Sequence, residues 1–367
     1  MEAGSKRRLT AGATALAIAG WALRDVPAEF GGKASGERLA RMLRSPRFHD
    51  GMFHNSVPSS VAVPSGPPPQ VLREMMGNRD RRHPAGPVPL VTHPATPASA
   101  DGVSAVWYGH ASTLVEIEGR RVLFDPVWSK RVSPSQLVGP KRLHPNPVPL
   151  TALPALDAVV VSHDHYDHLD RATVLELTAT QTAPFIVPLG IGAHLERWRV
   201  PAERIIELDW EEEAEVAGLR FTATAARHFS GRTFRRNDTL WGSWVVAGAQ
   251  RKVFYAGDSG YFDGYARIGG EHGPFDLTLM PIGAYNRNWP DIHMTPEEAV
   301  AAHLDLGGGL LLPVHWATFS LAPHPWTEPV ERLRLEAKAT GVHLALPRPG
   351  DRVDVGKTPE EAAWWEL

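Results

Sequence analysis

The segment "VVVSHDHYDHLD", residues 159–170, places three histidines and three aspartates directly after a run of apolar residues. Such a run predicts a buried strand, so the polar residues lie where that strand ends. Histidines and carboxylates this dense cannot be buried unless their ring nitrogens and oxygens have strong partners. The segment therefore indicates a metal site at the edge of a sheet.

Composition restricts how that metal can be bound. The chain has 367 residues, of which 43% are hydrophobic and 22% charged, so one large domain with an N-terminal extension accounts for it. It has no cysteine, which excludes disulfides, thiolate zinc sites and a cysteine nucleophile. Histidine and carboxylate ligands are typical of catalytic metal sites. The net charge of −3 and the lack of a basic stripe argue against a nucleic-acid partner.

The N-terminus differs in character from the rest. Lys6, Arg7 and Arg8 are followed by fifteen uncharged residues, so residues 1–23 are expected to form a signal or membrane-anchor segment. This segment predicts a membrane-associated or exported, periplasmic protein, with a cytoplasmic location as the alternative. Residues 24–100 are predicted to be a proline-rich arm that wraps the domain, with a short helix and turn over residues 34–55 and neither helix nor central strand from 56 to 97. The hydrolase domain is expected to cover residues 101–367.

Regular apolar patterns begin near residue 101 and predict an α/β (α+β) class with two sheets. Helices are expected at residues 171–180 and 296–305, the second capped by Thr295 with Pro296 at its first position and Glu298 three residues after the cap. The predicted strands include "VSAVWYGHASTLVEIEG", "RRVLFDPVW", "LDAVVVS", "PFIVPL", "LRFTATAA", "WGSWVVAG", "KVFYAGD", "DLTLMPIG" and "LLLPVHW".

Four of these apolar runs each end in a residue that can bind a metal. The residues are His163, His228, Asp258 and His315. Strand ends at one edge of a sheet are where scaffolds place active sites. The first segment supplies too many ligands for one ion, so two ions are expected, with Asp258 bridging them and a shared water that loses a proton near neutral pH.

The motif in residues 163–168, "HDHYDH", resembles the HxHxDH motif of the metallo-β-lactamase superfamily, and the later ligand candidates come in that superfamily's order. The resemblance implies a four-layer αββα sandwich with two zinc ions at one edge, manganese or iron being alternatives. It assigns one ion to His163, His165 and His228, the other to Asp167, His168 and His315, and Asp258 to both.

Within that superfamily, the chain resembles the N-acyl-phosphatidylethanolamine-hydrolysing phospholipase D family. The motifs that carry this resemblance include "SPRFHDGMFHN", "WYGHASTLVEI", "DPVWSKRVSP", "RHFSGRTFRRNDTLWGSWVV", "YAGDSGYF" and "HMTPEEAV". The resemblance implies phospholipase D-type hydrolysis of that phospholipid or a related one by a metal-bridging hydroxide. The loop "NRNWPDI" is shorter than in lipid-cleaving members, which leaves acyl-chain and head-group preference open.

Further residues are candidates for catalysis or binding. Asp164 is expected to transfer protons or to orient its neighbours by hydrogen bonds, and His293 to contact a phosphate or head group. Tyr285, Trp289 and Arg232 are expected to contact substrate, Arg232 through its charge. His110 either supports the metal site or packs in the core.

Two other functions compete with the phosphodiesterase hypothesis. One is a lactonase or small phosphoester hydrolase similar to the ascorbate-6-phosphate lactonases, and the other is a metal-dependent binding protein without catalysis. The expected partners are a phospholipid or other phosphodiester substrate, a membrane surface and a second copy in a homodimer.

Overall fold

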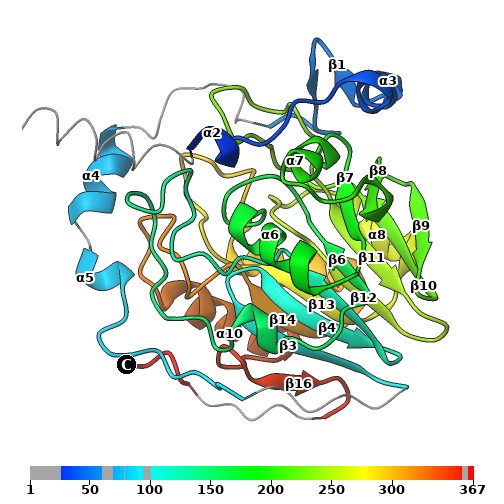
Figure 1. Ribbon diagram of the computed structural model, residues 1–367. Coiled ribbons are helices and arrows are strands. Elements are labelled where there is room, and N and C mark those ends of the chain that lie inside the picture. The colour runs from blue at the N-terminus through cyan, green and yellow to red at the C-terminus, as the bar shows by residue number, and fades with distance from the viewer. Residues whose placement is uncertain (1–25, 60–68, 78, 94–100, 358–362) are drawn as a thin grey trace, which may run out of the picture.

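The computed structural model describes residues 26–59, 69–77, 79–93, 101–357 and 363–367. Two seven-stranded sheets pack face to face, with helices on their outer sides, so the predicted αββα sandwich is confirmed (Figure 1). The predicted signal or anchor segment lies outside the described residues. Among those residues, no helix has the length and apolar character needed to cross a membrane.

The first sheet has the strand order β16-β3-β4-β5-β6-β7-β8 and is called the N-terminal sheet. Strands β5 to β8 run parallel, whereas β16, β3, β4 and β5 alternate in direction. Its strands are β3 (Val103–Gly109), β4 (Ser112–Ile117), β5 (Arg120–Phe124), β6 (Ala158–Val160), β7 (Phe185–Pro188), β8 (Ile205–Leu208) and β16 (Arg352–Asp354).

The second sheet has the order β15-β14-β13-β12-β11-β10-β9 and is called the C-terminal sheet. Strands β12 to β15 run parallel, and β9 to β12 alternate. Its strands are β9 (Glu213–Val216), β10 (Leu219–Thr224), β11 (Ser243–Ala247), β12 (Lys252–Tyr255), β13 (Phe275–Pro281), β14 (Gly308–Val314) and β15 (His343–Leu344).

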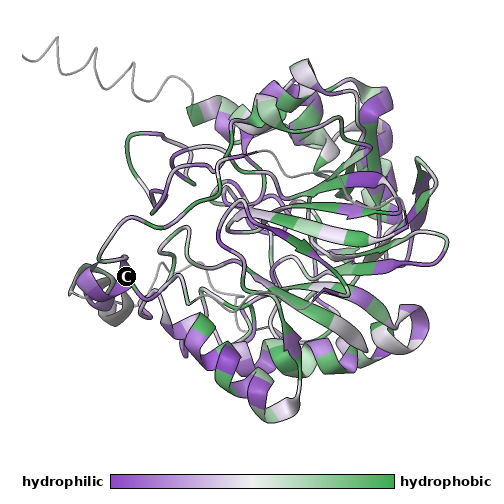
Figure 2. Ribbon diagram, turned by 90° about the horizontal axis from the view of Figure 1, so that it is seen from below, coloured by the Kyte–Doolittle hydropathy of each residue, from purple (hydrophilic) through white to green (hydrophobic). Residues whose placement is uncertain are grey.

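Side-chain alternation along the strands explains the layers. In β3, Ala105 and Trp107 face the core between the sheets, whereas Val106 and Tyr108 face an outer core beneath helices. This period of two is the pattern of a strand buried on both faces. Figure 2 shows hydrophobic residues gathered along the strands in the interior. Burial of apolar side chains between the two sheets therefore stabilises the sandwich, and the rigid sheets fix the positions of the loops at their edges.

The helices cover the outer faces. On the N-terminal sheet lie α6 (Arg171–Thr180) and α7 (Gly192–Arg197), with the 3₁₀ helices η2 (Leu150–Ala152) and η3 (Ala202–Arg204) in nearby loops. On the C-terminal sheet lie α8 (Gly264–His272), α9 (Pro296–Asp305) and α10 (Glu328–Thr340). Both predicted helices have the expected bounds, and the Thr295–Glu298 capping box of α9 is present.

The N-terminal arm contains more regular structure than its prolines suggested. It forms α2 (Val26–Glu29), α3 (Gly36–Arg44), the hairpin strands β1 (Phe48–His49) and β2 (Met52–Phe53), and then α4 (Pro69–Gly77) and α5 (Arg79–Arg82). The expectation of no helix between residues 56 and 97 was therefore wrong. Pro69 opens the described part of α4, and the other described prolines of this stretch lie outside α4 and α5.

Candidate metal centre

The strands that precede the ligand candidates all point to one edge of the sandwich. In the N-terminal sheet, β3 and β5 run in the same direction because both are antiparallel to β4, and β6 is parallel to β5. In the C-terminal sheet, β10 and β12 are both antiparallel to β11, and β13 and β14 are parallel to β12. The carboxyl ends of these strands deliver their side chains to a common site.

Three histidines form the first group of donor atoms. His163 Nε2 lies 2.9 Å from His165 Nδ1, and His228 Nε2 lies 3.4 Å from the same atom. Burial lowers the pKa of all three imidazoles, so the rings are neutral at pH 7 and each can present a lone pair. Three neutral imidazoles converging on one point are a donor set suited to a transition-metal ion.

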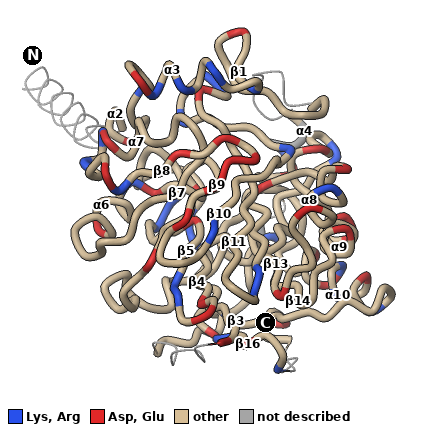
Figure 3. Tube along the Cα trace, turned by 90° about the vertical axis from the view of Figure 1, so that its right-hand side faces the viewer, with Lys and Arg blue, Asp and Glu red and all other residues tan. Residues whose placement is uncertain are grey.

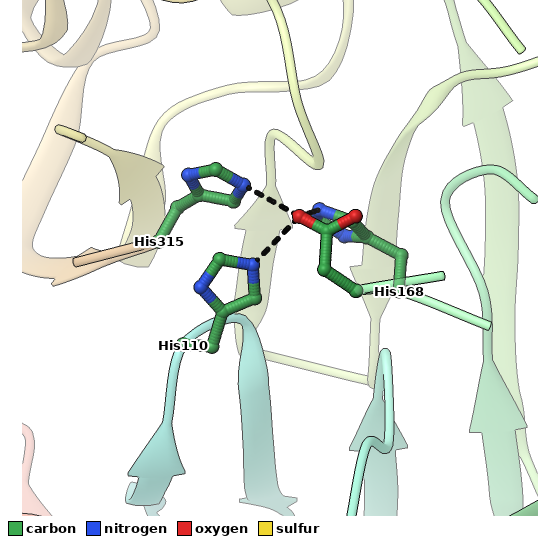
Figure 4. A group of neighbouring side chains, drawn as sticks. His110, His168 and His315 are labelled. Carbon is green, nitrogen blue, oxygen red and sulfur yellow. Dashed lines mark hydrogen bonds and ion pairs between the residues drawn. The ribbon is translucent and has the colours of Figure 1, made fainter. Parts of the chain in front are cut away.

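The second group consists of Asp167, His168 and His315. Asp167 Oδ2 lies 3.5 Å from His168 Nε2 and 3.3 Å from His315 Nε2. Figure 4 shows the rings of His168, His315 and His110 turned toward one carboxylate. Burial favours the neutral imidazole, but nearby aspartates raise the pKa of His168 well above its usual value and that of His315 to about 9. A metal ion at this group must displace those protons.

Asp258 lies between the two groups. Its Oδ2 is 3.1 Å from Nε2 of both His168 and His315, and 3.9 and 3.8 Å from Nε2 of His163 and His228. Against the effect of burial, His168, His315 and neighbouring His293 lower the pKa of Asp258 well below its usual value. An ionised carboxylate in this position can bind a cation on either side.

Unpartnered atoms support the fit of metal ions to these residues. His168 Nε2 and Asp258 Oδ1 are buried and lack a hydrogen-bond partner. Buried polar atoms are rarely left in this state, because each costs about 1–3 kcal/mol. Coordination would give His168 Nε2 its missing partner and would compensate the buried charge of Asp258. The structure thus brings together all seven predicted metal-binding residues in a centre able to hold two ions.

Asp125 belongs to this centre but was missed by the sequence reasoning. Its Oδ2 accepts a hydrogen bond from His168 Nδ1 at 2.6 Å and another from the Tyr255 hydroxyl, and Oδ1 accepts from Ser162 N at 2.7 Å. It fixes the ring of a metal-binding histidine from behind. The signal was present in the sequence, because Asp125 directly follows the apolar run "VLF" and Asp258 closely follows the apolar run "VFY".

His110, for which the sequence left open support of the site or core packing, contacts the second group. Its Nε2 lies 2.9 Å from Asp167 Oδ2, and burial lowers its pKa to about 3. His110, Asp125 and His315 have positive φ angles of 52°, 37° and 63°. Residues other than glycine seldom adopt this conformation, and such strain gathers at functional sites. The three residues directly follow β3, β5 and β14, where the backbone must turn sharply into the centre.

Asp164 and Arg232 are packed into the protein beside the centre. Asp164 Oδ1 accepts from Gly231 N at 2.6 Å, and Oδ2 lies 3.3 Å from Nε2 of His194. Arg232 donates to the carbonyl oxygens of Asp164, Leu169 and Glu29 at 2.7–2.8 Å. The guanidinium is buried, so the expectation that Arg232 attracts substrate is corrected: it ties three backbone segments together.

A cavity of about 620 Å³ opens next to the centre, and His293 and Tyr285 line it. His293 Nδ1 lies 3.8 Å from Asp258 Oδ2 and has no hydrogen-bond partner, so this ring stands between the cavity and the metal-binding residues. Burial lowers its pKa to about 4. The Tyr285 hydroxyl donates to Glu328 at 2.7 Å. Trp289 is not among the cavity's lining residues, and its indole donates to Ala284 O at 2.8 Å.

Comparisons with known proteins agree with this geometry. The family described as "Beta-lactamase superfamily domain" matches residues 120–316, which contain all seven metal-binding candidates. An uncharacterized protein of Mycobacterium tuberculosis is 51% identical, with 98% of each chain covered. N-acyl-phosphatidylethanolamine-hydrolyzing phospholipase D 1 of Caenorhabditis elegans is 37% identical over 64% of this chain and 70% of its own.

Solved structures resemble this fold as well. A metallo hydrolase of Ignicoccus hospitalis superposes with a TM-score of 0.52 at 23% identity, covering 69% of this chain and 97% of its own. A protein of Veillonella parvula, described as "a possible metal-dependent hydrolase", gives a TM-score of 0.54 at 16% identity, covering 69% of this chain and 99% of its own. These likenesses support the fold. Together with the family match, they show that the chain belongs to the metallo-β-lactamase superfamily and is a metal-dependent hydrolase.

Proposed function

We propose that this protein is a phospholipase D-type phosphodiesterase that holds two zinc ions and hydrolyses N-acyl-phosphatidylethanolamine or a related phospholipid. One observation carries the proposal: two groups of metal-binding atoms share Asp258 beside a cavity of about 620 Å³. The likeness to the phospholipase D of Caenorhabditis elegans supports the substrate class. Manganese or iron could replace zinc, since histidine and carboxylate ligands accept all three.

Bound ions at such a site polarise phosphoryl oxygens and lower the pKa of water. The protein's own residues then have two tasks. Asp125 and His110 hold the rings and carboxylate of the second group in place through hydrogen bonds. The two hydrogen bonds of Asp164 favour an orienting role, because one joins the "HDHYDH" segment to Gly231 in the loop that carries His228 and the other joins it to His194 of α7.

His293 is the residue best situated to contact a substrate in the cavity. Its lowered pKa makes the imidazole neutral at pH 7, so one ring nitrogen carries a proton and can donate to a phosphoryl or leaving-group oxygen. Tyr285 and His324, whose rings stack with centroids 4.7 Å apart, form part of the wall beyond it. These flat faces suit the apolar part of a lipid.

The proposal is tested by mass spectrometry of products. Zinc-loaded protein is incubated with N-acyl-phosphatidylethanolamine in mixed micelles, and metal content is measured on the same sample. We expect release of N-acylethanolamine and phosphatidic acid. Asp258→Asn should abolish turnover, whereas Asp263→Asn, an exposed carboxylate at the start of α8, should keep it.

Absence of both products from wild-type protein that holds two metals per chain would refute the lipid substrate. The same preparation is then assayed with a lactone and a small phosphoester. Turnover of either would assign the centre to the competing lactonase or phosphoesterase function.

A further inference from the structure

Two loops near the metal centre expose large apolar side chains. Phe234 is fully exposed in the loop 230–237, and Leu137 and Val138 are 54% and 66% exposed in the loop 132–140. Single exposed apolar residues are common on protein surfaces, whereas several at loop tips beside a functional site require an explanation.

Both loops are held in shape at their bases. In the first, Asn237 N donates to Ser230 O at 3.0 Å, and Arg232 anchors the chain in the interior. In the second, Val132 N donates to Pro140 O at 3.1 Å, and Arg131 pairs with Lys141 in an isolated bridge. The apolar tips are therefore presented by ordered loops and do not result from loose chain.

The charges that accompany these tips are almost all positive. The loop 132–140 and its flanks, residues 126–141, contain Lys130, Arg131 and Lys141 and no acidic residue. Besides the buried Arg232, residues 229–238 contain the exposed Arg235 and the half-buried Arg236, against a single acid, Asp238, which lies 3.4 Å from Arg235. Lys130 and Lys141 are exposed. Apolar loop tips flanked by exposed cations match the interface of a lipid bilayer, in which anionic head groups lie above the apolar lipid chains.

The two loops adjoin the metal centre at Tyr166, which is part of the "HDHYDH" motif. The Tyr166 hydroxyl donates to Arg232 O at 2.8 Å, and its ring belongs to the same small apolar cluster as Val132. Helix α2 is tied to the loop 230–237, because the backbone oxygen of Glu29 accepts a hydrogen bond from Arg232 at 2.7 Å.

We infer that the loops 132–140 and 230–237 form a membrane-docking surface, in which Leu137, Val138 and Phe234 insert among lipid chains and the surrounding lysines and arginines contact anionic head groups. This inference rests on the proposed function, because a phospholipase must reach lipids in a bilayer. The surface places the metal centre against the membrane, so that a phosphodiester at the interface lies close to the ligands.

Vesicle sedimentation tests the inference with the full-length, zinc-loaded chain. Vesicles of phosphatidylcholine and phosphatidylglycerol in equal parts are compared with pure phosphatidylcholine. We expect wild type to prefer the anionic vesicles and to lose that preference in 0.5 M salt, where the Debye length is roughly threefold shorter than in 0.05 M salt. Phe234→Ser and the pair Leu137→Ser with Val138→Ser should each weaken binding about tenfold, as the loss of a buried apolar side chain implies. Leu335→Ser, which changes an equally exposed leucine on α10, should bind as wild type.

Hydrolysis of the soluble diester bis(p-nitrophenyl) phosphate separates docking from chemistry. The loop variants should keep this activity and lose turnover of vesicle lipid. Equal vesicle binding by wild type and the loop variants would overturn the docking surface, whether or not any diester is cleaved. Loss of self-association in the variants by sedimentation velocity, with vesicle binding unchanged, would also overturn it and assign the surface to a second copy of the chain. Failure of the proposed function would appear differently, as intact vesicle binding without diester hydrolysis.

Discussion

At the residue scale, the metal-binding histidines depend on groups that hold their rings from behind. Asp125 does this for His168, and we expect Asp125→Asn to weaken binding of the second metal ion about 10- to 100-fold, as the loss of a supporting carboxylate typically does. Competition titration with a zinc chelator measures this affinity. The converging nitrogens of His163, His165 and His228 make no hydrogen bond to Asp125. The first group should therefore keep its ion in this variant.

Tyr255→Phe is the matched control for this variant. It removes one hydrogen bond to the Asp125 carboxylate but leaves the carboxylate and His168 in contact. Zinc affinity should therefore stay within a few-fold of wild type. If Asp125→Asn, folded by circular dichroism, bound two zinc ions as tightly as wild type, the supporting role of Asp125 would be wrong.

The same scale shows what the sequence could predict. The seven candidate metal-binding residues, which the structure brings together, could be selected because each follows an apolar run or falls in one dense motif. Asp125 has a similar signal, but Asp258 could be preferred because it falls between His228 and His315 in the superfamily's order of ligands, whereas Asp125 precedes the motif and could equally be a turn residue. The charge of Arg232 suggested substrate binding, yet its burial depends on backbone carbonyls from three distant segments, which no local pattern records.

At the element scale, the β1–β2 hairpin of the N-terminal arm secures a ligand loop. Asn55, just after the hairpin, donates to His228 O at 2.7 Å and accepts from His228 N at 3.1 Å. Asn55→Ala leaves both backbone groups without this partner, at about 1–3 kcal/mol for each that stays buried. We expect about tenfold weaker metal binding at the first group, seen as a shifted titration of the visible spectrum of the cobalt-substituted protein.

Met52→Ala provides the comparison within the same hairpin, because Met52 is exposed and pairs with His49 across the hairpin. Its cobalt titration should match wild type. An unchanged titration for Asn55→Ala would mean that the hairpin covers the loop without positioning His228.

Elements with strong local signals were predicted well, and those formed by distant contacts were not. The helix α9 carries a capping box and a proline at its start, and α6 is capped by Asp170, so their bounds could be read from the sequence. The strand β16 has only three residues and exists because it pairs with β3, some 250 positions earlier in the chain. The helices α4 and α5 lie in a proline-rich stretch whose composition argued against them.

At the scale of the whole molecule, the metal centre joins the two sheets. His163, His165, Asp167 and His168 follow a strand of the N-terminal sheet, whereas His228, Asp258 and His315 follow strands of the C-terminal sheet. Ions bound to both sets would cross-link the halves of the sandwich. In the view of Figure 3, the positions of lysines and arginines alternate along the trace with those of aspartates and glutamates.

Metal binding should therefore stabilise the whole fold, and the effect should grow with pH. A ligand that binds only the folded state adds about 4 kcal/mol at a thousand times its Kd. In the metal-free protein the pKa of His315 is raised to about 9, so its proton competes with the metal below that pH. Because His315 binds its proton more tightly in the folded state than in the unfolded state, protonated His315 contributes to the free energy of unfolding of the metal-free protein. This contribution is complete below about pH 6.5 and is lost as pH rises through about 9.

Both effects act in one direction. Between pH 6 and pH 8.5 the metal-free protein loses the stability that protonated His315 provides, while metal affinity rises as protons leave the site. The pKa values of Asp167 and Asp258 are lowered, so these carboxylates stay ionised across the window and do not reverse the trend. Differential scanning calorimetry of zinc-loaded and chelator-treated protein should show a gap in Tm that widens from pH 6 to pH 8.5. A gap that is constant or narrows would mean that zinc does not displace a proton from His315, and the assignment of that residue to the second ion would have to be abandoned.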